Sequence, residues 1–224
     1  MLPKIEVDER ILSVCPNIKI GLIRANVTNT STCDSLWNEI LEASDWVRES
    51  FELLEINARP GVSATRMVYK SFGKDPNRYR VASEALCRRI IRGLGLYRLT
   101  ALVDLINLVS IRSGYAISGL DADKIEGEIL SLGIGQEGEQ YEGIGRGLLN
   151  ICGMPVYRDS RGGVATPTSD EERTKITEDT KCVQININGY GPDMPMDEAV
   201  DMVVDLLKRY ANASNIETDI VDRF

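Results

Sequence analysis

The pattern of the sequence changes at Gly114, and this change constrains the fold more than any other feature. Before Gly114, apolar residues recur at three- and four-residue intervals, which predicts helices at 34–55, 62–72, 83–92 and 101–111. The last of these is apolar on nearly every side, so we expect it to be buried. After Gly114, short apolar runs alternate with Gly, Asp and Asn, which is typical of strands and turns. The chain is therefore predicted to have an α+β fold.

The other predicted elements complete this picture. Residues 18–23 are predicted to form an early strand, and residues 197–210 a late helix. Four apolar runs after Gly114 are candidate strands: 127–132, 148–152, 155–157 and 183–187. The tail at 212–224 is predicted to be either loose or a final strand. Because no Pro/Gly/Ser-rich linker interrupts the 224 residues, we expect a single domain whose helical N-terminal half packs on a mixed or antiparallel β-sheet core.

The chain contains no histidine, which restricts its chemistry. Ser-His-Asp and Cys-His mechanisms within one chain are excluded, as are most catalytic zinc sites. The five cysteines are odd in number, widely spaced and without a C-x-x-C motif, so neither a disulfide framework nor a cysteine zinc site is expected. We predict no metal and no cofactor. Any acid or base must be Asp, Glu, Lys, Tyr, Cys or the substrate itself.

Charge is unevenly distributed along the chain. The net charge is −8, yet residues 59–98 alone carry ten basic and two acidic side chains. Such a segment either binds a local anionic partner or balances acidic neighbours in the folded protein, and both alternatives stay open. No apolar stretch reaches the length of about 20 residues that crosses a bilayer. Because acidic residues occupy the N-terminus, where a signal peptide would be apolar, a cytoplasmic protein without membrane contact is expected.

Two groups of polar residues could form a site. Asp104, Asn107 and Ser110 make one polar stripe on the apolar helix. Either Asp104 caps a neighbouring loop and Asn107 braces a strand edge, or the stripe shapes a pocket. The second group is the run 162–174, which joins two glycines to hydroxyls, carboxylates and Arg173. This run is either a ligand-binding loop or a surface turn with a capping residue.

These residues carry a resemblance to a known family. Val103-Asp104-x-x-Asn107-x-Val109, followed by the stretch at 116–127, resembles the tRNA-editing domain of the phenylalanyl-tRNA synthetase beta subunit. The Gly162-Gly163 turn and the strand after Thr180 are also similar to that domain. The stretches 74–80, 83–89 and 167–174 resemble freestanding bacterial and archaeal proteins built on it. The resemblance covers about residues 65–190, with 1–64 and 191–224 as flanking elements.

The resemblance implies a mixed α+β fold with an aminoacyl-tRNA or amino-acid pocket. In the synthetase this domain hydrolyses the ester of tyrosine wrongly attached to the phenylalanine tRNA. This chain departs from the family pattern: Ser118 stands where the family has a histidine, Ala116 replaces a proline, and Asn186 replaces the editing glutamate. The chain is also too short to hold an aminoacylating catalytic domain, so it is not a complete synthetase.

The polar run, the basic segment and the resemblance together predict site residues and partners. Asp170 or Glu172 would orient a water and are the predicted catalytic residues. The predicted substrate-binding residues are Asp104, Asn107, Ser118, Asp121, Gly162, Gly163, Thr166, Ser169, Arg173, Thr174 and Asn186. The predicted RNA-binding residues are Lys70, Lys74, Arg78, Arg80, Arg88, Arg89 and Arg92. The expected partner is a tRNA or aminoacyl-tRNA 3′ end, or a free amino acid.

Three functions are compatible with these residues. The first is a trans-acting deacylase for mischarged tRNA, with the Gly162 and Gly163 N–H groups on the developing oxyanion. The second is a non-catalytic module that binds an amino acid, a nucleotide or an RNA end, with Arg173 on its anion and Asp104 or Asp121 on its amine. The third is a homo-oligomeric scaffold, in which the basic segment meets an acidic face of another copy.

Overall fold

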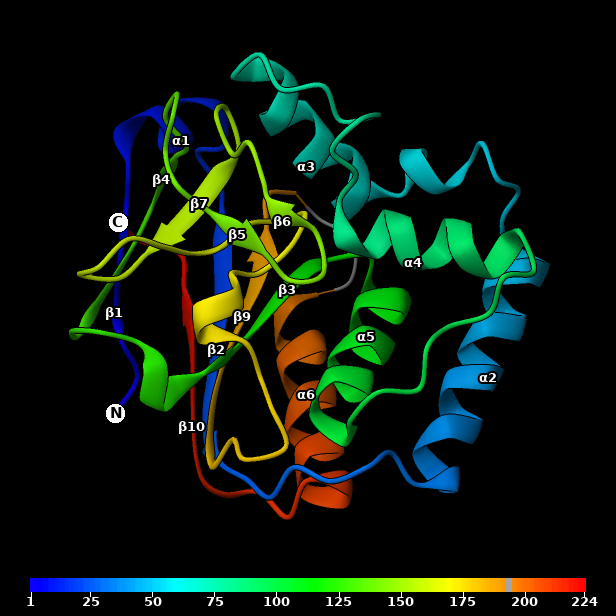
Figure 1. The fold of residues 1–224 in the computed structure, drawn as a ribbon. Coiled ribbons are helices and arrows are strands. Elements are labelled where there is room, and N and C mark those ends of the chain that lie inside the picture. Colours follow the sequence, from blue (N-terminus) through cyan, green and yellow to red (C-terminus); the bar gives the residue numbers. More distant parts are fainter. Residues whose placement is uncertain (192–194) are drawn as a thin grey trace.

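Two four-stranded sheets organise the part of the chain that the computed structural model describes, residues 1–191 and 195–224 (Figure 1). The first sheet has the order β10-β2-β9-β3, with every neighbouring pair antiparallel. Its strands are β2 (Lys19–Asn26), β3 (Ala116–Asp121), β9 (Cys182–Gly189) and β10 (Ser214–Val221). The flanking segments of the chain thus supply β2 and β10 to the same sheet as the central strands.

The second sheet has the order β1-β4-β7-β8. Strands β1 and β4 are parallel, and the other two pairs are antiparallel. Its strands are β1 (Lys4–Val7), β4 (Ile129–Ile134), β7 (Pro155–Arg158) and β8 (Gly163–Ala165). A separate two-stranded ribbon joins β5 (Glu142–Gly143) to β6 (Gly147–Leu148).

Two long helices pack directly on one face of the first sheet, and a third packs outside them (Figure 1). α5 (Ala101–Ser113) lies between α2 (Asp34–Ser50) and α6 (Met196–Tyr210), and α4 (Ala82–Ile91) packs on α2 and α5. α6 lies against β2 at Gly21, where a Cβ would come within 2.9 Å of Met196 and Val200. The remaining helices are α1 (Glu9–Val14), α3 (Pro60–Ser71) and the short 3-10 turns η1 (Ile56–Ala58), η2 (Ala122–Lys124) and η3 (Glu172–Thr174).

The alternation of side chains along β9 separates two cores. Val183, Ile185 and Ile187 join the apolar core beneath the helices. Successive side chains of a strand point to opposite faces, so Gln184, Asn186 and Asn188 face the second sheet. All three amides are buried, and the Tyr157 hydroxyl on β7 donates to Asn188 at 2.7 Å. The core between the two sheets is therefore partly polar.

The predicted fold class is confirmed, with differences in detail. The helices at 62–72, 83–92, 101–111 and 197–210 are present, and the early strand extends to Asn26. The helix predicted at 34–55 ends at Ser50, and most of 148–152 is not a strand. The N-terminal half also contains β1, a strand that the sequence analysis did not predict. Among the described residues, no helix combines the length and the apolar character needed to cross a membrane.

Candidate functional site

A cavity of about 430 Å³ lies between α5, β3 and the segment 166–176. It is lined by four predicted site residues, Asn107, Thr166, Ser169 and Asp170. Most of its other walls are apolar, from Ala82, Leu99, Val103, Ile106, Ile117, Ile144 and Ile176. Apolar walls with a few convergent polar groups are typical of small-molecule sites. We call this site the Asp170 cavity.

A tight turn places Asp170 against the free edge of β3. The Thr166 hydroxyl accepts hydrogen bonds from the N–H groups of Thr168 and Ser169, at 3.3 and 3.2 Å, and donates to the Ser169 carbonyl at 2.9 Å. The Asp170 carboxylate then accepts from the Gly119 N–H at 3.0 Å. β3 is the edge strand of its sheet, so this N–H is available to a side chain.

Asp170 has an unusual protonation equilibrium. Burial raises the pKa of its carboxyl to about 7, and hydrogen bonds from the Gly119 N–H and the Ser118 side chain oppose this rise only in part. Both protonation states are therefore populated at neutral pH. A carboxyl group in this range can accept a proton from one partner and return it to another.

Asp104 supports the cavity without lining it. Its carboxylate accepts a hydrogen bond from the Leu99 N–H at 2.9 Å and another from the Thr32 hydroxyl. Leu99 is a wall residue, so Asp104 fixes the backbone at one side of the cavity. Burial raises the pKa of Asp104, while the bonds from Thr32 and Leu99 lower it. Asp104 thus caps a neighbouring loop, as the first interpretation of the polar stripe proposed. Asn107 lines the cavity, as the second proposed.

A buried carboxylate that sequence reasoning missed, Asp159, holds two of the predicted ligand-binding residues. Arg173 donates to Asp159 at 3.0 and 3.1 Å and to the Lys124 carbonyl at 3.0 Å. The Gly162 N–H also donates to Asp159, at 3.1 Å. Arg173 and Gly162 therefore already have partners within the protein, and neither lines the Asp170 cavity. The only sequence signal for Asp159 was its place just before the Gly162-Gly163 turn.

Several predicted residues lie outside the cavity lining. Asp121 accepts from the Thr180 hydroxyl at 2.9 Å and pairs with Lys124 at 3.3 Å. Gly163 packs against the ring of Tyr141, and the Thr174 hydroxyl contacts the Val164 carbonyl at 3.4 Å. Glu172 forms an ion pair with Lys175. Lys175 does line the cavity, and the sequence analysis missed it because the motif ended one residue earlier.

Two of the three departures from the family pattern, Ser118 and Asn186, are neighbours in the sheet. Ser118 on β3 lies directly opposite Asn186 on β9, and both are buried. Asn186 accepts from the Gln184 amide at 2.9 Å. Within the described residues, Asn186 Nδ2 and Gln184 Oε1 have no hydrogen-bond partner. The side chains of Ser118 and Asn186 face the second sheet, and of these two residues only Ser118 forms a hydrogen bond with Asp170.

The predicted RNA-binding residues divide into two groups. Lys70, Arg78, Arg80 and Arg92 are exposed. The others are buried or half-buried: Lys74 donates to the Asn150 carbonyl at 2.5 Å, Arg88 to the Leu53 carbonyl at 3.0 Å and Arg89 to the Gly95 carbonyl at 2.6 Å. Three of the seven predicted residues are therefore engaged by main-chain carbonyls within the protein, and the four exposed ones stay candidates for an anionic partner.

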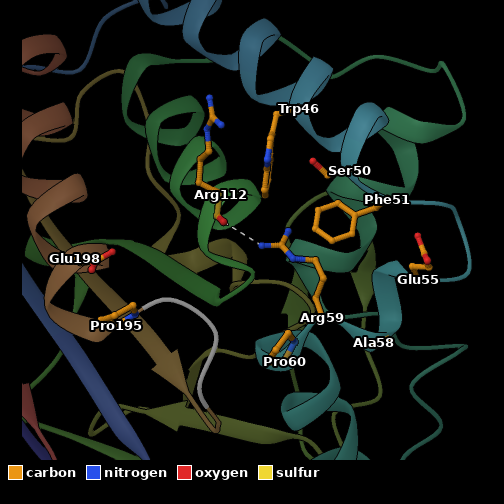
Figure 2. Close-up of a pocket in the computed structure, with 10 residues that line it drawn as sticks. All are labelled: Trp46, Ser50, Phe51, Glu55, Ala58, Arg59, Pro60, Arg112, Pro195 and Glu198. Atoms are coloured by element: carbon orange, nitrogen blue, oxygen red, sulfur yellow. Dashed lines mark hydrogen bonds between the residues drawn. The ribbon is translucent and has the colours of Figure 1, made fainter.

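A larger cavity of about 620 Å³ contains none of the predicted site residues (Figure 2). Figure 2 shows Arg59 beside Phe51, with a hydrogen bond to the main-chain carbonyl of Arg112. Arg59 donates to the carbonyls of Ile111 and Arg112 at 2.8 and 3.0 Å, and its guanidinium lies 5.7 Å from the Trp46 ring. Arg59 thus satisfies carbonyls at the end of α5, where helical partners are missing.

The comparisons with known proteins agree with the motifs. The profile of the B3/4 domain family matches residues 64–212, a range that contains α5, β3 and the whole Asp170 cavity. No curated protein matches the sequence. Among solved structures, an N-terminal fragment of the phenylalanyl-tRNA synthetase beta subunit from Pyrococcus horikoshii is similar, with a TM-score of 0.48 and 15% identity. That match covers 100% of this chain and 56% of the fragment, so this chain spans about half of the fragment's length. Because the family profile covers most of the sequence, this chain belongs to the B3/4 domain family.

Proposed function

We propose that this chain binds the aminoacylated 3′ end of a tRNA in the Asp170 cavity and hydrolyses the aminoacyl ester. Membership of the B3/4 domain family and the motif resemblance to a tRNA-editing domain support the substrate class. The observation that carries the proposal is a carboxyl group with a pKa of about 7 at the wall of a mostly apolar cavity. Without histidine in the chain, Asp170 is the best-placed group to move a proton near neutral pH.

The proposed reaction needs one water and no cofactor. Ionised Asp170 accepts a proton from the water while the water oxygen attacks the ester carbonyl carbon. The bond from that carbon to the ribose oxygen then breaks, and protonated Asp170 returns its proton to the ribose oxygen. The products are a free amino acid and an intact tRNA 3′ end. Each proton and electron pair is thus accounted for with Asp170 alone as acid and base.

Other groups in the cavity have supporting roles in this proposal. Lys175 provides a positive charge for the oxygen that becomes negative during attack, and its ion pair with Glu172 holds it in place. Glu172 therefore acts as a positioning residue. Asn107, Thr166 and Ser169 offer polar atoms to the amino group and the ribose. The apolar walls receive the side chain of the amino acid.

The proposal is tested by single-turnover deacylation of a panel of charged and mischarged tRNAs. Asp170→Asn keeps an oxygen for the Gly119 N–H but removes the proton acceptor. We expect it to lower the rate by about 10²- to 10⁴-fold, as loss of a general base does. Asp201→Asn, an exposed carboxylate on α6, is the matched control and should keep the full rate.

The pH dependence of the same reaction provides a second readout. The rate should rise through pH 7 and level off above it, because the ionised form of Asp170 is the reactive one. If the unaltered protein, at saturating concentration, hydrolyses no ester faster than buffer does, the deacylase proposal is wrong.

A second function is favoured by Ser118 and Asn186. These residues stand where the resembled family has a histidine and a glutamate, and a domain that had lost catalysis would retain the pocket. Such a module would bind an amino acid, a nucleotide or an RNA end without turnover. Tight binding of an aminoacyl-tRNA with no acceleration of its hydrolysis would favour this second function over the first.

A further inference from the structure

The loop between α4 and α5 exposes large side chains beside the Asp170 cavity. Leu94, Tyr97 and Leu99 are 59%, 67% and 54% exposed. Three large exposed side chains within six residues of one loop concentrate apolar surface, and concentrated apolar surface marks interaction sites. Leu99 also lines the Asp170 cavity, so the exposed surface of the loop reaches the cavity wall.

Tyr97 has the arrangement of a stacking platform. The Arg89 guanidinium lies 4.2 Å from the centre of its ring and covers one face. Arg89 is itself fixed, because it donates to the carbonyls of Gly95 and Leu94 at 2.6 and 3.4 Å. With 67% of Tyr97 exposed, the rest of the ring is open to solvent and to a second planar group.

The protein also fixes the position of this loop. Arg98 donates two hydrogen bonds to the Thr32 carbonyl, at 3.1 and 2.6 Å, and the Leu99 N–H is bound by Asp104. The Ala101 N–H donates to the Thr30 carbonyl at 2.8 Å. Figure 1 shows the loop running from the end of α4 along the α2 side to the start of α5. A platform held at both ends loses little conformational freedom when a ligand stacks on it.

The chemistry of the loop favours a nucleic acid as its partner. Apart from Tyr97, the ionisable residues from Arg92 to Leu99 are two arginines, Arg92 and Arg98. Arg89 adds a third guanidinium beside the ring. Asp34 pairs with Arg98 at 2.7 Å and offsets part of this charge, while Arg92 stays exposed. Proteins that bind single strands without sequence preference combine aromatic rings, on which bases stack, with cations that contact the phosphates.

We propose that this loop binds the unpaired 3′ nucleotides of the tRNA, with a base stacked on the open face of Tyr97. This inference rests on the proposed function and extends it to the path of the RNA. Two residues of chain span at most about 7 Å, so the backbone of Tyr97 lies within that distance of Leu99, a wall residue of the cavity. The base on Tyr97 therefore belongs to the last nucleotides before the aminoacyl group. Arg92, which is exposed at the end of α4 three residues after Arg89, is the cation that would meet their phosphates.

The test compares two RNA hairpins, one with a single-stranded 3′ overhang and one that is blunt. Their Kd values are measured for the unaltered protein, Tyr97→Ala, Tyr97→Phe and Met67→Ala. We expect the unaltered protein to favour the overhang, and Tyr97→Ala to weaken overhang binding about ten-fold while leaving the blunt hairpin unchanged. Tyr97→Phe keeps the ring and should behave as the unaltered protein does. Met67 is equally exposed but lies on α3, so Met67→Ala is the matched control.

The outcomes separate this inference from the proposed function. If Tyr97→Ala binds the overhang as tightly as the unaltered protein and deacylates tRNA normally, the platform is refuted while the deacylase proposal stands. If no variant binds either hairpin or any tRNA, both proposals fail together. If Tyr97→Ala leaves RNA binding intact but changes the oligomeric state in sedimentation, the loop is a contact between copies of this chain and the inference is wrong.

Discussion

Asp170 and Asp159 show how hydrogen-bond partners determine whether the pKa of a buried carboxyl group ends above or below its usual value. Burial favours the neutral acid in both cases. Asp170 receives hydrogen bonds from the Gly119 N–H and the Ser118 side chain, and its pKa stays raised, at about 7. Burial also raises the pKa of Asp159, but Arg173 and three backbone N–H groups outweigh it and lower the pKa below its usual value. The first residue can exchange protons near neutral pH, and the second is a fixed anion.

The stability of the protein should reveal the raised pKa of Asp170. Between the pKa of the unfolded chain and pH 7, the folded protein holds a proton that the unfolded chain has lost. Asp170 therefore lowers the free energy of unfolding as the pH rises from about 4 to 7. We expect Asp170→Asn to stabilise the protein at pH 8 by on the order of 2 kcal/mol and to have little effect at pH 4. Thermal melts across this range test it, and an effect independent of pH would contradict it.

Replacement of Asp159 should have the opposite effect. Its depressed pKa contributes stability that is present above the pKa of the unfolded chain and is lost as the pH falls through the folded value. Asp159→Asn leaves Arg173 without its buried partner and should cost about 3 kcal/mol at pH 7. Urea unfolding at pH 7 and pH 3 measures this, and the cost should shrink at the lower pH. The exposed pair of Arg161 and Glu126 is the control, because Glu126→Gln should change stability by less than about 1 kcal/mol.

At the scale of elements, the Asp170 cavity exists because β3 carries a glycine opposite α5. A Cβ on Gly119 would lie 2.4 Å from the end of Ile106 and 3.0 Å from the end of Ile176, both wall residues. The absence of a side chain there keeps space between helix and strand. The sequence pattern drew attention to polar residues near this point, but it gave no reason to single out the glycine.

Gly119→Ala is predicted to narrow the cavity and leave the fold intact. The added methyl group meets the flexible ends of two isoleucines, so the loss of stability should stay within about 1–3 kcal/mol. We expect weaker binding of the aminoacyl end, seen as a higher KM in the deacylation assay. Gly119→Ala combined with Ile106→Val restores space and should recover part of the loss. Unchanged KM in the single variant would show that substrate does not enter beside Gly119.

At the scale of the whole molecule, an acidic protein is expected to bind RNA through a restricted basic surface. The net charge of −8 repels RNA in general, while Lys70, Arg78, Arg80 and Arg92 are exposed. If all four contact phosphates, the logarithm of the affinity should fall with the logarithm of salt concentration with a slope of about −3. Arg92→Ala should reduce that slope by about 1. Lys208→Ala, an exposed lysine on α6, should leave it unchanged, and equal effects of both variants would contradict a defined RNA path.

Elements with strong periodicity were predictable from the sequence, and short or isolated ones were not. α3, α4, α5 and α6 follow apolar residues at helical spacing, because each buries one face or nearly its whole surface. β1 and α1 have only four and six residues, too few for a pattern to emerge. β10 is largely exposed at the edge of its sheet, so its sequence left two alternatives open for the tail, and the structure shows the final strand.

The sequence by itself determined the fold class, the family, the absence of histidine chemistry and the candidate loop at 162–174, because these depend on residue type and local spacing. Only the tertiary structure decided which polar residues meet. Asp170 reaches the Gly119 N–H across 51 positions of the chain, and this contact, with burial, sets its pKa. Arg173 forms hydrogen bonds with Asp159, and Arg88 donates to a main-chain carbonyl, although the sequence predicted both as ligand-binding or RNA-binding residues. Burial and partner choice arise from segments far apart in the chain, so no local pattern contains them.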